Sequence, residues 1–245
     1  MNRTSITGLA CLLAVALTAC AGGGEPPAPS GSPASAPLEA LKEPANSMPV
    51  SPPLSPAPVS AEALAAYRAL LAGEPGALDR PPEGLELHQV TLPPAEELEY
   101  VLLDLDGDGG AELVVQMVAQ PHQFNAVFHY GDGELSCWQY DIMEMSCRDY
   151  PLGDGAMVRQ YDTGTGPNRY SNLYTVFRYL PDGETEECAS LAVHQDTQED
   201  GTEVFTYLVD DAEVDQDTFA AEFEELVGSR LLSLEDWTPA TERPG

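Results

Sequence analysis

The sequence has few basic residues, and beyond its first 20 residues it has no long apolar run. Residues 60–245 carry 38 acidic side chains and 8 basic ones, and none of the basic residues is lysine. Nucleic acids and anionic lipid surfaces are bound through dense positive charge. The composition therefore excludes nucleic acid as a partner. Most of these acids serve solubility. A large negative charge also suits an exported domain whose acidic side chains are partly neutralised by divalent cations.

Sequence motifs of common enzyme classes are also missing. The chain has no His-Glu-x-x-His, no Gly-x-Ser-x-Gly and no phosphate-binding Gly-x-x-x-x-Gly-Lys. Its histidines are isolated, at His88, His122, His129 and His194. An isolated histidine is more often structural or exposed than catalytic. A binding module is therefore the favoured class. The alternative is an exported hydrolase using carboxylates or calcium, although no catalytic pair can be identified.

The start of the chain is typical of an exported lipoprotein. Arg3 precedes an apolar stretch of about a dozen residues, which is too short to span a bilayer. The sequence Leu-Thr-Ala-Cys at residues 17–20 resembles the bacterial lipobox, which is cleaved before a cysteine that then carries acyl chains such as palmitate. We expect residues 1–19 to be a signal peptide. Lipid on Cys20 would anchor the protein to the cell membrane on its extracellular side.

Two regions follow the predicted cleavage site. Residues 20–59 hold 11 of the 22 prolines, mixed with serine, glycine and alanine. Such a segment cannot bury enough apolar surface to offset the entropy lost on ordering, so it predicts a tether. Residues 60–245 are the right size for one acidic globular domain, which we expect to be a monomer.

The most specific motif is Asp-Leu-Asp-Gly-Asp-Gly-Gly-Ala-Glu at residues 104–112. Calcium takes about six to eight oxygen ligands, which a tight loop supplies from alternating acids, a backbone carbonyl and a closing acid. The predicted ligands are Asp104, Asp106, Asp108, the carbonyl of Gly110, and Glu112. The alternative is a polar turn between strands, because aspartate and glycine dominate turns in any case.

This loop resembles the strand-loop-strand calcium sites, Asp-x-Asp-x-Asp-Gly-x-x-Asp/Glu, of FG-GAP and integrin-type repeat proteins. Residues 99–103 and 113–118, on either side of the loop, have the pattern of strands, whereas an EF-hand loop lies between two helices. An EF-hand also has a glutamate at the twelfth position of its loop, where this chain has Val115. The order of lipobox, tether and loop is similar to that of uncharacterised lipoproteins of Gram-positive bacteria. The resemblance implies calcium as the cofactor and brings no established activity.

The periodicity predicts an α+β domain, in which a curled antiparallel sheet carries an N-terminal and a C-terminal helix, with the calcium loop between two strands. One helix is expected from Ser60 to near Gly73, and the other from Asp215 or Asp217 to Gly228. Strand patterns lie between them, at residues 99–103, 113–118, 124–130, 135–140, 157–161, 173–180, 189–194 and 204–209. A propeller needs several blades of four strands, which a region of this size with one calcium motif cannot supply.

Cys137 and Cys147 are candidates for a disulfide, which would stabilise the domain by about 2–4 kcal/mol. The alternative is that these two and Cys188 are small buried thiols.

A glycine-rich loop ends in Arg169 and Tyr170, which are candidates for contact with an extracellular protein or glycan. The simpler explanation is a flexible turn. Several tyrosines have strand spacing, namely Tyr130, Tyr140, Tyr150, Tyr161, Tyr170, Tyr174 and Tyr179. If they shared one exposed face, they would form a platform for a glycan or peptide.

Overall fold

The computed structural model describes residues 57–140, 147–166, 168–242 and 244. Residues 1–56 lie outside these ranges, so the signal peptide, the lipidation site Cys20 and nearly all of the tether stay predictions. In the described part of the chain, no helix is long and apolar enough to cross a membrane. Nearly all of the described residues lie within residues 60–245, and the boundaries of the domain stay a prediction.

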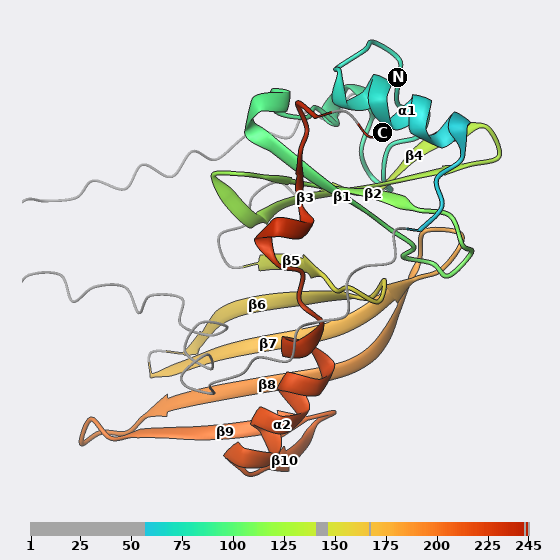
Figure 1. Ribbon diagram of the computed structural model, residues 1–245. Helices are drawn as coiled ribbons and strands as arrows, with labels where there is room; N and C mark the ends of the chain where they lie inside the picture. The colour runs from blue at the N-terminus through green and yellow to red at the C-terminus, as the bar shows by residue number, and fades with distance from the viewer. Residues whose placement is uncertain (1–56, 141–146, 167, 243, 245) are drawn as a thin grey trace, which may run out of the picture. The chain divides into compact units, whose positions relative to one another are not determined.

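The described strands form two antiparallel sheets (Figure 1). The first sheet has the order β11-β1-β2-β3-β4, with the strands Leu98–Leu103 (β1), Glu112–Met117 (β2), Gln120–Gly131 (β3), Glu134–Tyr140 (β4) and Thr238–Pro239 (β11). The second has the order β10-β9-β8-β7-β6-β5, with the strands Cys147–Pro151 (β5), Met157–Gly166 (β6), Arg169–Tyr179 (β7), Thr185–Thr197 (β8), Glu203–Val209 (β9) and Ala212–Val214 (β10). All neighbours except β11 and β1 are consecutive in the chain.

This arrangement fits the predicted α+β class and antiparallel pairing, but the prediction of one curled sheet is wrong, because there are two. The chain leaves the first sheet after Tyr140 and enters the second at Cys147. Alternating apolar residues identify the two faces of a strand, yet they do not specify which neighbour it pairs with. One continuous sheet and two separate sheets therefore have the same local sequence pattern.

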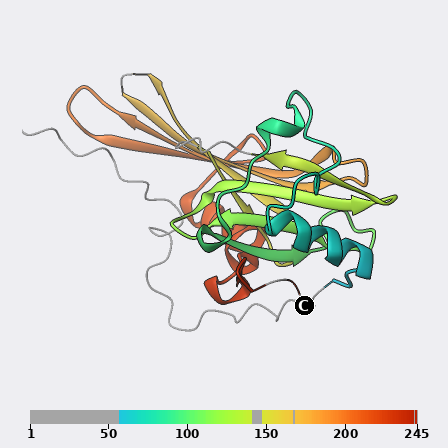
Figure 2. The same ribbon diagram turned by 90° about the horizontal axis from the view of Figure 1, so that it is seen from above.

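Each of the two predicted helices covers one sheet. The side chain of Ser60 caps α1 (Ala61–Leu71), and that of Asp215 caps α2 (Gln216–Leu226). The residues that face the sheets are apolar, namely Ala63, Tyr67 and Leu71 in α1, and Phe219 and Phe223 in α2. Figure 2 shows α1 lying against strands of the first sheet. Short 3-10 helices lie at Leu87–Gln89 (η2), Ala95–Glu97 (η3), Gly228–Arg230 (η4) and Leu234–Asp236 (η5).

A cluster of apolar side chains joins the two sheets. Its members are Val101, Leu103, Leu105, Val114 and Val127 from the first sheet and its β1–β2 loop, Met157, Phe177 and Tyr179 from the second sheet, and Trp237. Leu105 is fully buried, although it belongs to the acidic loop. Because burying a leucine contributes about 1.5–3 kcal/mol, this side chain fixes one end of the loop to the shared core.

Candidate metal centre

The acidic motif forms the connection between β1 and β2. Leu103 and Glu112 pair directly across the hairpin, so the loop comprises residues 104–111. Its amides turn inward and donate to its own carboxylates, in the pairs Gly107 N to Asp104 Oδ1 (2.8 Å), Gly109 N to Asp104 Oδ2 (3.1 Å), Asp108 N to Asp106 Oδ1 (3.0 Å) and Gly110 N to Asp108 Oδ1 (2.6 Å). Gly107 and Gly109 have φ of 77° and 88°, which side chains other than glycine rarely adopt. The chain therefore makes the predicted strand-loop-strand unit.

The predicted ligand side chains gather in two groups. Asp104, Asp106 and Asp108 each offer one oxygen within 4.8 Å of the others. Glu112 belongs to a second group, with Asp106 and His129, that meets the same distance limit. Asp106 is common to both groups, and the role of the Gly110 carbonyl stays a prediction.

Glu112 is buried at the start of β2. Its Oε2 accepts a hydrogen bond from the amide of Leu105 at 2.7 Å, and its Oε1 lies 2.9 Å from Nδ1 of His129 in β3. Burial raises the pKa of Glu112, and the hydrogen bonds from His129 and Leu105 offset this only in part. Burial lowers the pKa of His129, but Glu112, Asp106 and Asp108 outweigh it, so that the pKa of His129 is raised. Burial of Glu112 and the acids around His129 therefore raise the pKa of both side chains.

Asp106 uses only one of its two carboxylate oxygens in the hydrogen bonds of the loop. Its Oδ2 is buried and has no hydrogen-bond partner among the described residues. Burial raises the pKa of Asp106, and the carboxylates of Asp108 and Asp104 raise it further. A buried polar atom without a partner costs free energy that a bound cation would recover.

The loop is held from both sides by other parts of the domain. The hydroxyl of Tyr67 in α1 donates to the carbonyl of Ala111 at 2.8 Å, and burial, then the charge of Glu112, raises the pKa of Tyr67. On the other side, the carbonyl oxygen of Asp104 lies against Gly155, which has φ of 84° in the turn between β5 and β6. A Cβ at Gly155 would collide with that oxygen. The loop thus lies where the first helix and both sheets meet.

Stacked rings connect this centre to the second sheet. The ring of His129 stacks on Trp138 in β4, with centroids 4.3 Å apart, and Trp138 stacks on Tyr179 in β7 at 5.2 Å. The Tyr179 hydroxyl donates to Oε1 of Gln139 at 2.5 Å, and the Gln139 amide donates to the buried carboxylate of Asp149 in β5. These contacts run from His129 in the first sheet to Tyr179 and Asp149 in the second.

Three of these contacts could not be predicted from the sequence. His129 faces Glu112 because of the pairing between β2 and β3, which no local pattern specifies. Gly155 belongs to a sequence, Gly-Asp-Gly, that is typical of an ordinary turn. Tyr67 has helical spacing that predicts a core role, and only its hydroxyl indicates that it needs a partner.

The other predicted site residues lie in different places. Arg169 begins β7 and lies 3.6 Å from Asp196 of β8, and Tyr170 follows it in the strand. The tyrosines do not share one exposed face. Tyr150, Tyr174 and Tyr179 are buried. The exposed Tyr161 pairs with Leu173, which places it on the face of the sheet opposite to Tyr170.

The cysteines are divided between the two sheets. Cys137 is buried in β4, Cys147 begins β5 and is half-buried, and Cys188 is exposed on β8. The disulfide between Cys137 and Cys147 stays a prediction.

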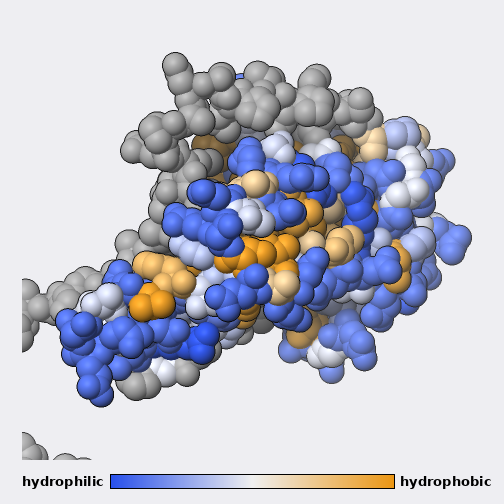
Figure 3. All heavy atoms as spheres, turned by 90° about the horizontal axis from the view of Figure 1, so that it is seen from below, coloured by the Kyte–Doolittle hydropathy of each residue, from blue (hydrophilic) through white to orange (hydrophobic). Residues whose placement is uncertain are grey.

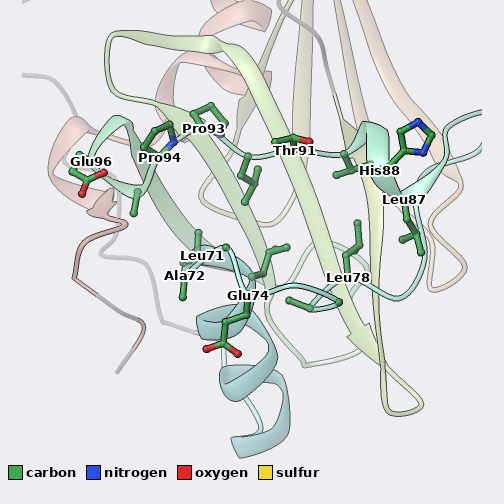
Figure 4. A pocket seen from close by; sticks show the side chains of 17 residues that line it. Leu71, Ala72, Glu74, Leu78, Leu87, His88, Thr91, Pro93, Pro94 and Glu96 are labelled. Atoms are coloured by element: carbon green, nitrogen blue, oxygen red, sulfur yellow. The ribbon is translucent and has the colours of Figure 1, made fainter.

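Two hollows lie outside the acidic loop itself. One, of about 860 Å³, lies between the end of α1 and residues 87–96, with mostly apolar side chains around it, including Leu71, Leu78 and Leu87 (Figure 4). A second, of about 420 Å³, lies beside Trp138 and is more polar. Figure 3 shows one face of the molecule on which hydrophilic side chains surround a smaller hydrophobic area. Neither of the two hollows is lined by the acids of the loop.

Comparison of the chain with protein-family models, with curated proteins and with solved structures found no match in any of the three. A function must therefore be argued from the geometry of the described residues and from the chemistry of the sequence.

Proposed function

We propose that this protein is a lipid-anchored module, displayed outside the cell, whose domain binds calcium at residues 104–112. It acts by binding an extracellular protein or glycan, and Cys20 carries its membrane anchor. One observation supports the calcium site most strongly. Asp104, Asp106 and Asp108 bring oxygens within 4.8 Å of one another, and Oδ2 of Asp106 is buried without a hydrogen-bond partner. Oxygen ligands from alternating acids are what calcium requires.

The role of the ion in this proposal is structural. Carboxylates this close repel one another, and a divalent cation removes that repulsion. An ion in the loop would fix the carbonyl of Asp104 against Gly155 and that of Ala111 against Tyr67. Calcium would in this way join α1, the first sheet and the second sheet. Weak extracellular sites have dissociation constants of about 10⁻⁴ to 10⁻³ M, so such a site fills outside the cell and stays empty in the cytosol.

The alternative is an exported hydrolase that uses the same acids. Burial raises the pKa values of Asp106 and Glu112, as a general acid requires. However, Glu112 is buried and bonded to Leu105 and His129, and neither acid lines either of the two hollows described above. These contacts favour a structural role for both acids.

Thermal unfolding of the full chain tests the calcium proposal. At a calcium concentration ten times the dissociation constant, we expect stabilisation by about 1.4 kcal/mol, or a rise in Tm of about 3–6 °C over the chelated protein. Asp104→Asn should abolish the rise. Asp200→Asn is the matched control, because Asp200 also accepts a backbone hydrogen bond in a turn, from Thr202 at 2.9 Å, but lies outside both groups of possible ligands. A rise of equal size in wild type and Asp104→Asn would refute calcium binding by the loop.

A panel of glycan and ester substrates separates the two functions. A binding module should turn over none of them. Turnover by the wild type that is lost in Asp106→Ala would overturn the preference for binding.

A further inference from the structure

A histidine and two carboxylates meet on the inner side of the acidic loop. His129 comes from β3, Glu112 from the start of β2, and Asp106 from the loop, and one ligand atom of each lies within 4.8 Å of the others. The side chains of His129 and Glu112 are only 15% and 2% exposed. This group therefore differs in composition and burial from the three aspartates of the calcium proposal, with which it shares Asp106.

The distances in this group suit a metal ion. Nδ1 of His129 and Oε1 of Glu112 are 2.9 Å apart. A tetrahedral zinc ion at about 2.0–2.1 Å from each atom would need them about 3.3–3.4 Å apart, whereas their spacing of 2.9 Å corresponds to an angle of about 90° at the ion. That is the angle between neighbouring ligands of a five- or six-coordinate ion. Asp106 completes the group with a carboxylate whose Oδ2 is buried and accepts no hydrogen bond from the described residues.

The ligands are held in place by their surroundings. Oε2 of Glu112 accepts the amide hydrogen of Leu105, which leaves Oε1 directed at His129. The imidazole is packed flat against Trp138, with the two planes at 11°, and Gly131 leaves room beside Nε2 where a Cβ would collide. Such outer contacts fix the orientation of metal-binding histidines and carboxylates.

We propose that Asp106, Glu112 and His129 form a second metal site, for a divalent transition ion such as zinc. Imidazole is a good ligand for zinc and similar ions, whereas calcium takes oxygen ligands only. A simple ion pair between His129 and Glu112 would explain those two residues, but it does not explain why the carboxylate of Asp106 lies within 4.8 Å of both. The inference rests on the proposed calcium function in that both sites use Asp106, and in that Glu112 is also the closing acid predicted for the calcium loop.

Calorimetric titration of the full chain with zinc, in the presence of saturating calcium, tests the proposal. We expect saturable binding of one zinc ion per chain, weakened at least tenfold by His129→Gln. His88→Gln is the matched control, because His88 also lies near a glutamate, 3.2 Å from Glu86, but is exposed. Its affinity for zinc should equal that of the wild type. Non-saturable binding by the wild type, or equal affinities of the two histidine variants, would overturn the proposal.

A measurement on the wild type covers the case in which His129→Gln does not fold. In histidine ¹⁵N spectra, zinc should shift Nδ1 of one of the four histidines, and that histidine should be His129. A shift confined to other histidines, or none, would refute the site.

The same samples separate this inference from the calcium proposal. Calcium stabilisation should be lost in Asp104→Asn and kept in His129→Gln, and zinc binding should be kept in Asp104→Asn. If calcium has no effect but His129-dependent zinc binding remains, only the calcium function is wrong. If zinc binding does not depend on His129 while calcium still stabilises the fold, only the second site is wrong.

Discussion

Replacing Gly155 with alanine should loosen the acidic loop from the second sheet. Gly155 has φ of 84°, where a residue with a Cβ is strained by about 1–2 kcal/mol. The new Cβ would also lie more than about 1 Å inside the normal contact distance to the Asp104 carbonyl oxygen. Crowding of this kind adds about 1–3 kcal/mol, so we expect Gly155→Ala to lower the free energy of unfolding by about 2–5 kcal/mol. Because Asp104 must move, calcium affinity should also fall, by about tenfold.

The matched control is Gly201→Ala. Gly201 has nearly the same φ, 83°, in a turn of the same sheet, but its Cβ would meet nothing within 4 Å. This variant should therefore show only the backbone strain, about 1–2 kcal/mol, and unchanged calcium affinity. Urea unfolding of both variants gives the stabilities, and calorimetry gives the affinities. Equal destabilisation by the two substitutions, or wild-type calcium affinity in Gly155→Ala, would refute the contact between the loop and the second sheet.

Three further substitutions test other parts of the account. Tyr67→Phe removes the hydrogen bond to Ala111 and should cost about 1–3 kcal/mol in urea unfolding, because a buried carbonyl loses its partner; an unchanged midpoint would contradict this. Burial raises the pKa of Asp154, but the hydrogen bond and charge of Arg230 outweigh it, so the pKa is lowered on folding. The stabilisation from this half-exposed pair is then present above the unfolded pKa of 3.8 and is lost as the pH falls through the folded pKa. In Asp154→Asn, the stability lost across that acid range should be smaller than in the wild type, by under about 1 kcal/mol. Identical profiles of stability against pH in the two proteins would refute the effect. Cys20→Ala should move the protein out of the membrane fraction, and retention there would exclude a lipid on Cys20 as the anchor.

Local features of the fold could be predicted, because they depend on neighbouring residues. Ser60 and Asp215 each place an acceptor before an amphipathic segment, and both cap a helix. The alternating aspartates and glycines likewise specify a loop between β1 and β2. These residues form their contacts within a few positions of the chain, so their pattern carries the information.

Features that depend on distant pairing could not be predicted. The alternation of the strands is compatible with one sheet or with two. The division of the acids into two groups depends on His129, whose contact with Glu112 follows from strand pairing and burial. The packing of Gly155 against Asp104 joins residues in different sheets. In each case the partner is determined by the tertiary structure.

Calorimetric titration of the chelated full chain with calcium tests the central claim most directly. We expect saturable binding of one calcium ion per chain, with a dissociation constant of about 10⁻⁴ to 10⁻³ M, and its loss in Asp104→Asn but not in Asp200→Asn. Absence of saturable binding by the wild type, or binding that survives in Asp104→Asn, would contradict it.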